Sequence, residues 1–136
     1  MDLAEIATVE VTSEDPQFPI EASLASQSPG WRAAGPGDQQ VRLIFDAPIS
    51  INRVHLRFEE SAAERTQEFT LRWSAVHGGP SIEIVRQQWN FSPSGSTSEV
   101  EDYTVGLNHV SVLELAIRPD ISGNEAIASL AEFRIR

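Results

Sequence analysis

The sequence predicts an all-β protein, an antiparallel β-sandwich or jelly roll of about eight short strands. Three observations support this fold class. Apolar residues alternate with polar ones through most of the chain, Gly/Pro/Ser-rich turns separate these runs, and no long helical pattern occurs. The length of 136 residues fits a single domain over residues 1–136, large enough to bury a core without disulfide bonds.

The clearest strands lie in residues 39–58, QQVRLIFDAPISINRVHLRF. In each of two runs, 40–45 and 51–58, apolar residues recur at every second position through most of the run. Because successive side chains of a strand point to opposite faces, each run has one apolar face and one more polar face. Asp46, Pro48 and Ser50 break the pattern, which predicts two strands joined by a short turn.

The residues before this pair predict one strand and a long stretch of loops. Val9 and Val11 alternate with polar neighbours in TVEVTS, residues 8–13. The remaining segments are a loop with two prolines (14–19), a possible single helical turn (20–24), and turn residues throughout 26–38, which contain Trp31 and Arg32.

The second half of the chain continues this succession of short runs and turns. We expect a charged connection (59–67), a strand (69–73), a turn (77–80), a return strand from Ile82, a flexible loop (92–98), a weakly alternating run (99–107), a buried strand (110–117) and a loop (118–125). Residues 126–136 fit either helix or strand spacing, and we favour a strand for the last six residues.

The return strand contains an irregularity near Arg86. Apolar residues first fall on the parity of Ile82 and Ile84, and continuing that parity would bury Arg86 and expose Trp89. Either a β-bulge resets the strand at this point, or the strand presents a tryptophan outward.

Composition excludes several function classes. The formal net charge is −10, from 20 acidic residues and 10 basic ones, all of which are arginine, and the sequence shows no basic cluster. We therefore expect no binding to nucleic acid or to anionic membranes. The absence of cysteine excludes disulfide bonds and thiolate metal sites. Residues 1–20 contain no secretory signal and no window approaches the ~20 apolar residues of a membrane span, so we expect a cytoplasmic protein.

The sequence contains no set of residues that indicates catalysis. His55, His77 and His109 fall in a strand, a turn and a loop, without a shared motif. Adjacent acidic residues at 59–60 and 99–102 are more often solvated surface than acid–base pairs in a chain this acidic. We expect a protein that is not an enzyme, with no cofactor and no phosphate-binding loop.

The order of these features resembles the discoidin or F5/8 type C family of galactose-binding-like β-sandwiches. The resemblance is carried by TVEVTS, the Gly30–Trp31 loop, the 39–58 segment, EFTLRWSAVHGG, VSVLELAIRPD and AEFRIR, and it covers nearly the whole chain. It implies a binding module, commonly for glycans and sometimes for lipid head groups or proteins, rather than a catalyst.

The chain departs from the family's pattern in two places. The family often carries an Asp-Gly-Asp-like turn before the loop tryptophan that contributes to a calcium site, whereas residues 23–28 here read SLASQS. Calcium requires several oxygen ligands, usually including carboxylates, so we expect no metal site of this type. The cysteine pair of many family members is also missing.

Five residues are candidates for ligand binding on loops at one end of the sandwich, within 30–38, 59–67 and 86–98, with 14–19 beside them. An aromatic face suits a sugar's C–H face, and planar polar groups suit its hydroxyls. The candidates are Trp31, Arg65, Arg86, Trp89 and Asn90.

Each of these candidates except Asn90 also has a structural interpretation. Trp31 is favoured as a buried plug, Trp89 suits packing as well as recognition, and Arg65 suits an exposed ion pair of ~0–1 kcal/mol. For Arg86, a buried tie to a carboxylate is favoured.

The sequence therefore predicts a non-catalytic binding module, carbohydrate-binding through loops at one end of the sandwich. The alternative is a cytoplasmic protein–protein interaction or assembly domain with no glycan ligand. Partners are accordingly a possible glycan or protein.

Overall fold

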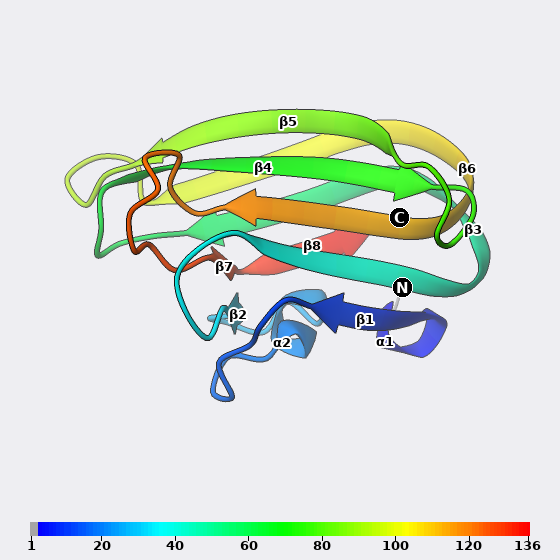
Figure 1. Ribbon diagram of the computed structural model, residues 1–136, viewed down its shortest axis with the longest axis horizontal. Helices are drawn as coiled ribbons and strands as arrows, with labels where there is room; N and C mark the ends of the chain where they lie inside the picture. The colour runs from blue at the N-terminus through cyan, green and yellow to red at the C-terminus, as the bar shows by residue number, and fades with distance from the viewer. Residues whose placement is uncertain (1–2) are drawn as a thin grey trace.

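The computed structural model describes residues 3–136 and confirms the all-β class. Figure 1 shows eight strands and two short helices. They are α1 (Leu3–Ile6), β1 (Ala7–Val11), α2 (Ile20–Leu24), β2 (Trp31–Arg32), β3 (Gln39–Glu59), β4 (Arg65–Ser74), β5 (Ile82–Phe91), β6 (Ser98–Arg118), β7 (Ser129–Leu130) and β8 (Glu132–Ile135).

Strands β3 and β6 form the frame of the molecule, because each has 21 residues and they pair with each other along most of that length. Both curve round at one end of the molecule, so their halves lie in two facing layers (Figure 1). The five-stranded layer contains β1, the first half of β3, the second half of β6, β4 and β5. The three-stranded layer contains β8, the second half of β3 and the first half of β6.

The turn predicted within residues 39–58 is wrong. A hairpin turn would pair the two halves of this segment with each other, whereas both halves pair antiparallel with β6. Register irregularities between Ile44 and Arg53 instead bend one continuous strand from the first layer into the second. The polar residues of this segment therefore mark a bend and not a chain reversal.

The core lies between the two layers and is built from the predicted alternation. Phe58 of β3 and Phe69 of β4 stack across the layers with ring centroids 5.3 Å apart. Burying a side chain of this kind contributes roughly 1.5–3 kcal/mol. Other core residues with at most 6% exposure include Val41, Leu43, Phe45, Val54, Leu56, Leu71, Leu113, Leu115, Ile117, Phe133 and Ile135. The strand favoured for the end of the chain is confirmed as β8.

A β-bulge in β5 explains the irregular alternation near Arg86. Leu71 pairs with Val85 and Arg72 pairs with Glu83, so one extra residue, Ile84, sits between these pairs. After the bulge, Trp89 is half-buried against the core and the side chain of Arg86 is 49% exposed. The bulge interpretation is confirmed, and the expectation of a buried Arg86 is wrong, because the extra residue reverses the faces.

Candidate functional site

The structure places Trp31 inside the fold. Its side chain is fully buried, and its indole Nε1 donates to the Ser13 carbonyl at 3.0 Å. The Trp31 backbone N–H donates to Ser23 Oγ at 2.9 Å, while the Ser23 hydroxyl itself donates to the Leu130 carbonyl. Trp31 therefore has the geometry of the structural plug. Ser23 lies in the segment that corresponds to the family's calcium turn, and here its hydroxyl links Trp31 to Leu130 by hydrogen bonds.

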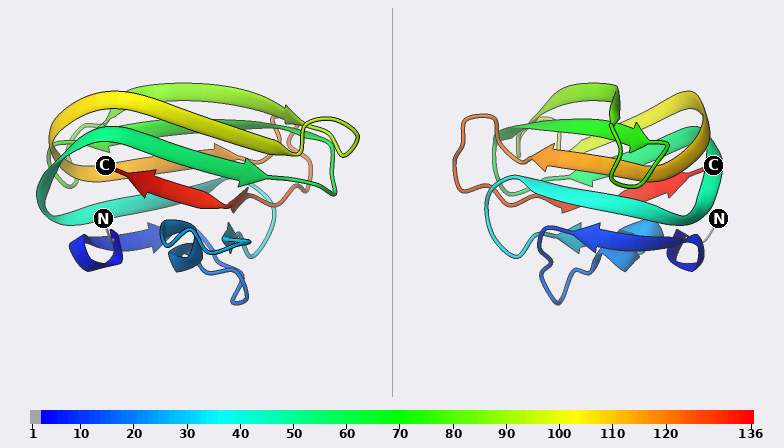
Figure 2. Two further views of the ribbon diagram at one scale, coloured as in Figure 1. Left: turned by 180° about the vertical axis from the view of Figure 1, so that it is seen from behind. Right: turned by 45° about the vertical axis from the view of Figure 1, so that its right-hand side comes forward.

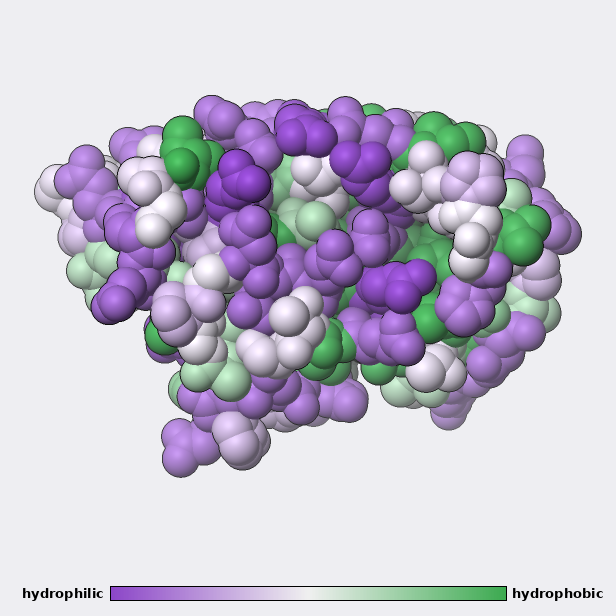
Figure 3. All heavy atoms as spheres, in the orientation of Figure 1, coloured by the Kyte–Doolittle hydropathy of each residue, from purple (hydrophilic) through white to green (hydrophobic). Residues whose placement is uncertain are grey.

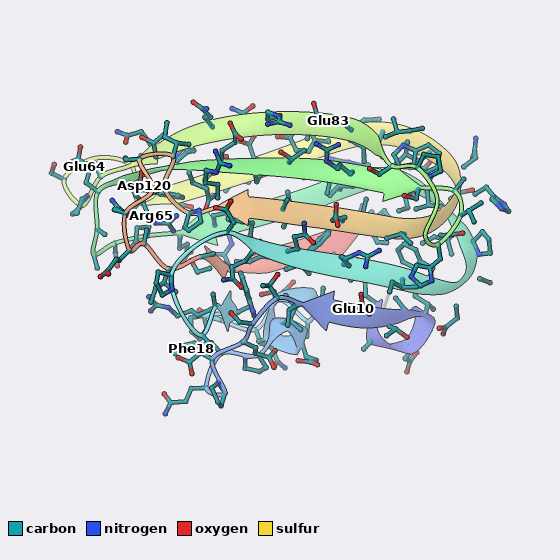
Figure 4. All side chains as sticks on the ribbon, in the orientation of Figure 1. Glu10, Phe18, Glu64, Arg65, Glu83 and Asp120 are labelled. Carbon is teal, nitrogen blue, oxygen red and sulfur yellow. The ribbon has the colours of Figure 1, made fainter. Side chains whose placement is uncertain are left out.

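Arg65 is also buried, at 2% exposure, and its guanidinium serves contacts within the fold. It donates to Glu60 at 2.8 Å, to the Pro119 carbonyl at 2.8 Å, and to Gln67 at 3.1 Å. Figure 4 shows Arg65 at the start of β4, beside the loop that carries Asp120. The buried Arg–carboxylate tie expected at Arg86 is thus found at Arg65.

The three remaining candidates lie on β5 and face two different ways. Trp89 Nε1 donates to Ser96 Oγ at 3.1 Å, and exposed Asn90 accepts from the Thr66 hydroxyl at 3.0 Å, both close to the 92–97 loop. Arg86 pairs with Glu83 at 3.0 Å and with Glu68 at 3.3 Å.

Arg86 lines a groove on the outer face of the five-stranded layer. This groove has a volume of about 440 Å³. Figure 3 shows this face, where charged and polar residues surround a paler hollow.

Of the five residues predicted from the sequence, only three lie close together. The pairing of β4 with β5 places Arg65, Trp89 and Asn90 near one another, and Trp31 and Arg86 lie elsewhere.

A larger cavity, about 600 Å³, lies on the outer face of the three-stranded layer, beside the two short helices. Figure 2, in its left view, shows this face with β6, β3 and β8 side by side and α1 and α2 along its edge. We name this cavity the basic pocket. Its lining residues are Leu3, Leu24, Ala25, Ser26, Arg53, His55, Asp102, Arg134, Ile135 and Arg136.

The basic side chains of this pocket form a compact block across two strands. His55 of β3 lies directly opposite Arg134 of β8. Reciprocal backbone hydrogen bonds of 3.0 and 3.1 Å join Arg53 to Arg136 one step further along. Side chains directly opposite in an antiparallel pair have Cβ atoms about 4.5–5.5 Å apart. Four basic groups therefore emerge next to one another on one surface.

The arginines of this block differ from all the others in the chain. Six arginines outside the pocket form ion pairs with carboxylates: Arg42, Arg57, Arg65, Arg72, Arg86 and Arg118. A seventh, Arg32, lies over the ring of Phe18 at 5.7 Å. Within residues 3–136, only Arg53, Arg134 and Arg136 form neither an ion pair nor a contact with an aromatic ring. All three line the basic pocket.

Acidic groups in and beside the pocket engage His55. Its Nδ1 lies 2.8 Å from Asp102 Oδ1, and its Nε2 lies 3.9 Å from Glu132 Oε2. Partial burial alone would raise the pKa of Glu132, but the hydrogen bond and charge of Arg57, with the charge of His55, hold that pKa below its usual value. The histidine is thus held in place, while the three arginines keep their donors available.

A second polar cluster lies between the layers, and its residues line neither the groove nor the basic pocket. Gln67 Nε2 donates to fully buried Glu99 at 3.2 Å. Burial, followed by the neighbouring Glu101 carboxylate, raises the pKa of Glu99 to about 9. Burial and the charges of Glu101 and Glu99 also raise the pKa of the Tyr103 phenol. These groups therefore influence one another's protonation between the layers.

Sequence reasoning missed the basic pocket. The statement that the chain has no basic cluster is true of the linear sequence and wrong for the folded protein. Arg53 and Arg134 are far apart in sequence, and the pairing of β8 with β3 brings them together. The signal was the basic residues at alternate positions in 53–57 and 134–136, but it required knowing that these strands pair.

None of the helices within 3–136 is long and apolar enough to cross a membrane. In the same residues, histidine and acidic side chains form no group of three or more that is placed to hold a metal ion.

Comparisons with known proteins identify similar folds among solved structures. No protein-family model matches the chain, and no curated protein sequence matches it either. A family 32 carbohydrate-binding module from C. perfringens NanJ, solved with galactose, aligns over 98% of this chain and 95% of its own, with TM-score 0.70 and 12% identity. A chitosan-binding module from Paenibacillus sp. IK-5 aligns over 100% and 98%, with TM-score 0.69 and 17% identity.

A third similar structure comes from a different functional class. The N-terminal domain of the single-strand break repair protein XRCC1 aligns over 96% of this chain and 98% of its own, with TM-score 0.66 and 13% identity. Identities this low establish a common fold and nothing more specific. The chain therefore has the galactose-binding-like β-sandwich fold that the sequence resemblance implied, the fold of the family 32 carbohydrate-binding modules.

Proposed function

We propose that this protein is a non-catalytic carbohydrate-binding module and that its ligand contacts the basic pocket. The observation that carries the proposal is the cavity of about 600 Å³ in which Arg53, Arg134 and Arg136 present guanidinium groups without ion-pair partners among residues 3–136. The fold adds support, because similar modules are solved with galactose or with N-acetylgalactosamine-β-1,3-galactose bound.

The chemistry of the pocket suits an amphipathic ring. Leu24 and Ala25 line the pocket on the helical side, where they are partly exposed and offer apolar contact to the C–H groups of a sugar. Arginine donors and the Asp102 carboxylate lie on the sheet side, where they suit sugar hydroxyl and ring oxygens. The pocket thus combines apolar and polar walls, which is the arrangement that small-ligand sites commonly have.

Binding without reaction is favoured because His55 lacks a nucleophile. A nucleophilic site requires a hydroxyl or thiol within hydrogen-bond reach of its base. Ser26, the hydroxyl residue that lines the pocket, donates to Glu132 at 3.3 Å rather than to His55. Asp102 and Glu132 therefore hold His55 as a polar wall of the site.

A glycan array followed by NMR titration tests the proposal. We expect Arg134→Gln to weaken binding of a retained glycan roughly tenfold or more, because a charge-assisted donor to the ligand is lost. Arg118→Gln is the matched control, since Arg118 is exposed outside the pocket and pairs only with Asp38 at 3.5 Å. The proposal fails if no glycan binds below millimolar concentration, or if both variants behave alike.

The loop end predicted from the sequence is the second candidate location. Asn90 is exposed there beside the 92–97 loop, and half-buried Trp89 lies next to it in β5. Asn90→Ala distinguishes the two locations within the same titration. Loss of binding in Asn90→Ala, with Arg134→Gln unaffected, would place the ligand at the loop end.

A protein-interaction role is the second candidate function. Reduced XRCC1, a structure with this fold, is bound to a DNA polymerase β catalytic domain. In this protein, Val76 and Ile82 are 64% and 56% exposed on either side of the β4–β5 turn. Size-exclusion chromatography with light scattering tests self-association through this turn. A dimer that the double variant Val76→Ser/Ile82→Ser converts to monomer would favour this candidate.

A further inference from the structure

We propose that the basic pocket selects sugars that carry a carboxylate, of the uronic acid type. This inference rests on the proposed carbohydrate-binding function and adds the class of ligand. Its starting point is the two-by-two block of Arg53, His55, Arg134 and Arg136. Like charges directly opposite each other in an antiparallel pair are destabilising. An anion that neutralises this block removes that repulsion, and its binding is favoured for this reason.

The distribution of acidic residues strengthens this reasoning. The chain has twice as many acidic as basic residues, and six arginines outside the pocket each have a carboxylate within 4.0 Å. Carboxylates are therefore abundant in this protein as partners for arginine. No side-chain carboxylate within residues 3–136 lies within 4.0 Å of the guanidinium groups of Arg53, Arg134 or Arg136, which leaves them available to a carboxylate of the ligand. A guanidinium suits this partner, because its fork of donors matches the two oxygens of a carboxylate.

The acidic groups of the pocket favour one negative charge over several. The side chain of Asp102 is 48% exposed in the pocket, and the Glu132 carboxyl lies 3.9 Å from His55 at its edge. A doubly charged phosphate would meet stronger repulsion from these two carboxylates than a singly charged carboxylate would. Asp102 is also an acceptor for a sugar hydroxyl, a donor that acetate lacks.

The remaining wall of the pocket points to a sugar ring rather than to a small anion. Half-buried Leu24 and exposed Ala25 form apolar contact surface beside the block. Acetate or inorganic phosphate would leave this surface uncovered, whereas a pyranose ring with one carboxylate fills it with C–H groups. The structure therefore matches a ligand with one carboxylate, several hydroxyls and an apolar ring face.

Calorimetric titration with a matched pair of ligands tests the inference. A galacturonate oligosaccharide is compared with its methyl ester, which has the same ring and hydroxyls but no charge. We expect the acid to bind at least roughly tenfold more tightly than the ester at low salt, and this preference to shrink as salt is added. Inorganic phosphate and acetate are titrated alone as two further arms, and we expect weak binding of both.

Variants of the pocket arginines test whether the preference for the acid depends on their positive charge. We expect Arg53→Gln/Arg134→Gln to weaken binding of the acid much more than binding of the ester, so that the preference for the acid is lost, and Arg118→Gln to retain that preference. Both changed side chains are exposed, and thermal unfolding verifies that the variants fold.

The possible outcomes distinguish this inference from the proposed function. Equal binding of acid and ester would overturn the inference and leave a carbohydrate-binding module. Phosphate or acetate binding as tightly as the galacturonate would overturn the assignment to a sugar acid. Failure of both this pair and every glycan on the array would overturn the proposed function itself.

Discussion

Gly30 shows how one residue permits the packing around Trp31. Its φ angle is +88°, a left-handed conformation that side-chain-bearing residues adopt at a cost. A Cβ atom at this position would lie 2.4 Å from the Leu130 carbonyl oxygen, and that carbonyl also accepts the Ser23 hydroxyl. The close approach of these segments therefore depends on the missing side chain.

We expect Gly30→Ala to lower the free energy of unfolding by about 2–4 kcal/mol, because it adds backbone strain and a clash with main-chain atoms. Urea unfolding measures this change. Gly35→Ala is the matched control, since a Cβ there would meet nothing within 4 Å. Similar losses in both variants would contradict the assigned role of Gly30.

Glu99 is a second residue whose properties come from its surroundings. Its pKa of about 9 in the folded protein lies well above the ordinary value of 4.5. The folded state therefore holds a proton that the unfolded state releases between these two values. Stability from this group is complete below about pH 4.5 and declines as the pH rises toward 9.

We expect Glu99→Gln to be more stable than the parent protein at pH 8, on the order of 1–3 kcal/mol, because the amide is never charged. This advantage should diminish toward pH 4.5. Thermal unfolding across this pH range measures it, with Glu125→Gln as an exposed control. A stability difference that does not change with pH would contradict the raised pKa.

At the scale of elements, the pairing of β8 with β3 builds the basic pocket and is reinforced by charge. Glu132 of β8 lies opposite Arg57 of β3 and accepts from its Nε at 2.8 Å. The pKa of Glu132 is lowered in the folded state, because the Arg57 contact and the charge of His55 outweigh partial burial. Its contribution is therefore present above the ordinary carboxyl pKa and is lost as the pH falls through the folded-state value.

We expect Glu132→Gln to lower the free energy of unfolding by about 1 kcal/mol at pH 7, since a charge-assisted hydrogen bond becomes a neutral one. The difference should vanish in acid, where the parent carboxyl is also neutral. Urea unfolding at pH 7 and at pH 3 measures both values. Glu64→Gln is the control, because Figure 4 shows Glu64 at the far end of the β3–β4 connection, away from β8.

At the scale of the whole molecule, the net charge of −10 surrounds a local basic pocket. The overall charge repels a polyanion whose own charges come within the screening length, about 8–10 Å in physiological salt. A short ligand with one carboxylate can enter the pocket without meeting most of this repulsion. An extended polyanion cannot avoid it, so we expect the pocket not to serve as a nucleic-acid surface.

We therefore expect no complex with a short DNA duplex at about 0.15 M salt, where non-specific affinity depends on neutralised phosphates. An electrophoretic mobility shift measures this. Tight binding that weakens steeply with added salt would contradict the prediction and would indicate that the basic pocket extends further than its lining residues.

The sequence by itself determined most of the longer strands, most of their inward faces and the core. Alternation is a local property, and it placed Phe58, Phe69 and Phe133 correctly without knowledge of their neighbours. Even the β5 irregularity was visible as a break in that pattern near Arg86. The resemblance of the segment order to a known family was enough to identify the sandwich fold.

Only the tertiary structure decided which strands are neighbours, and with them the candidate site. Whether residues 46–50 reverse the chain or bend it depends on β6, which begins about fifty residues later. Whether Arg53 stands alone or beside Arg136 depends on the last strand of the chain. Strand pairing joins residues distant in sequence. Sites that it forms, such as the basic pocket, therefore cannot be predicted from any local pattern.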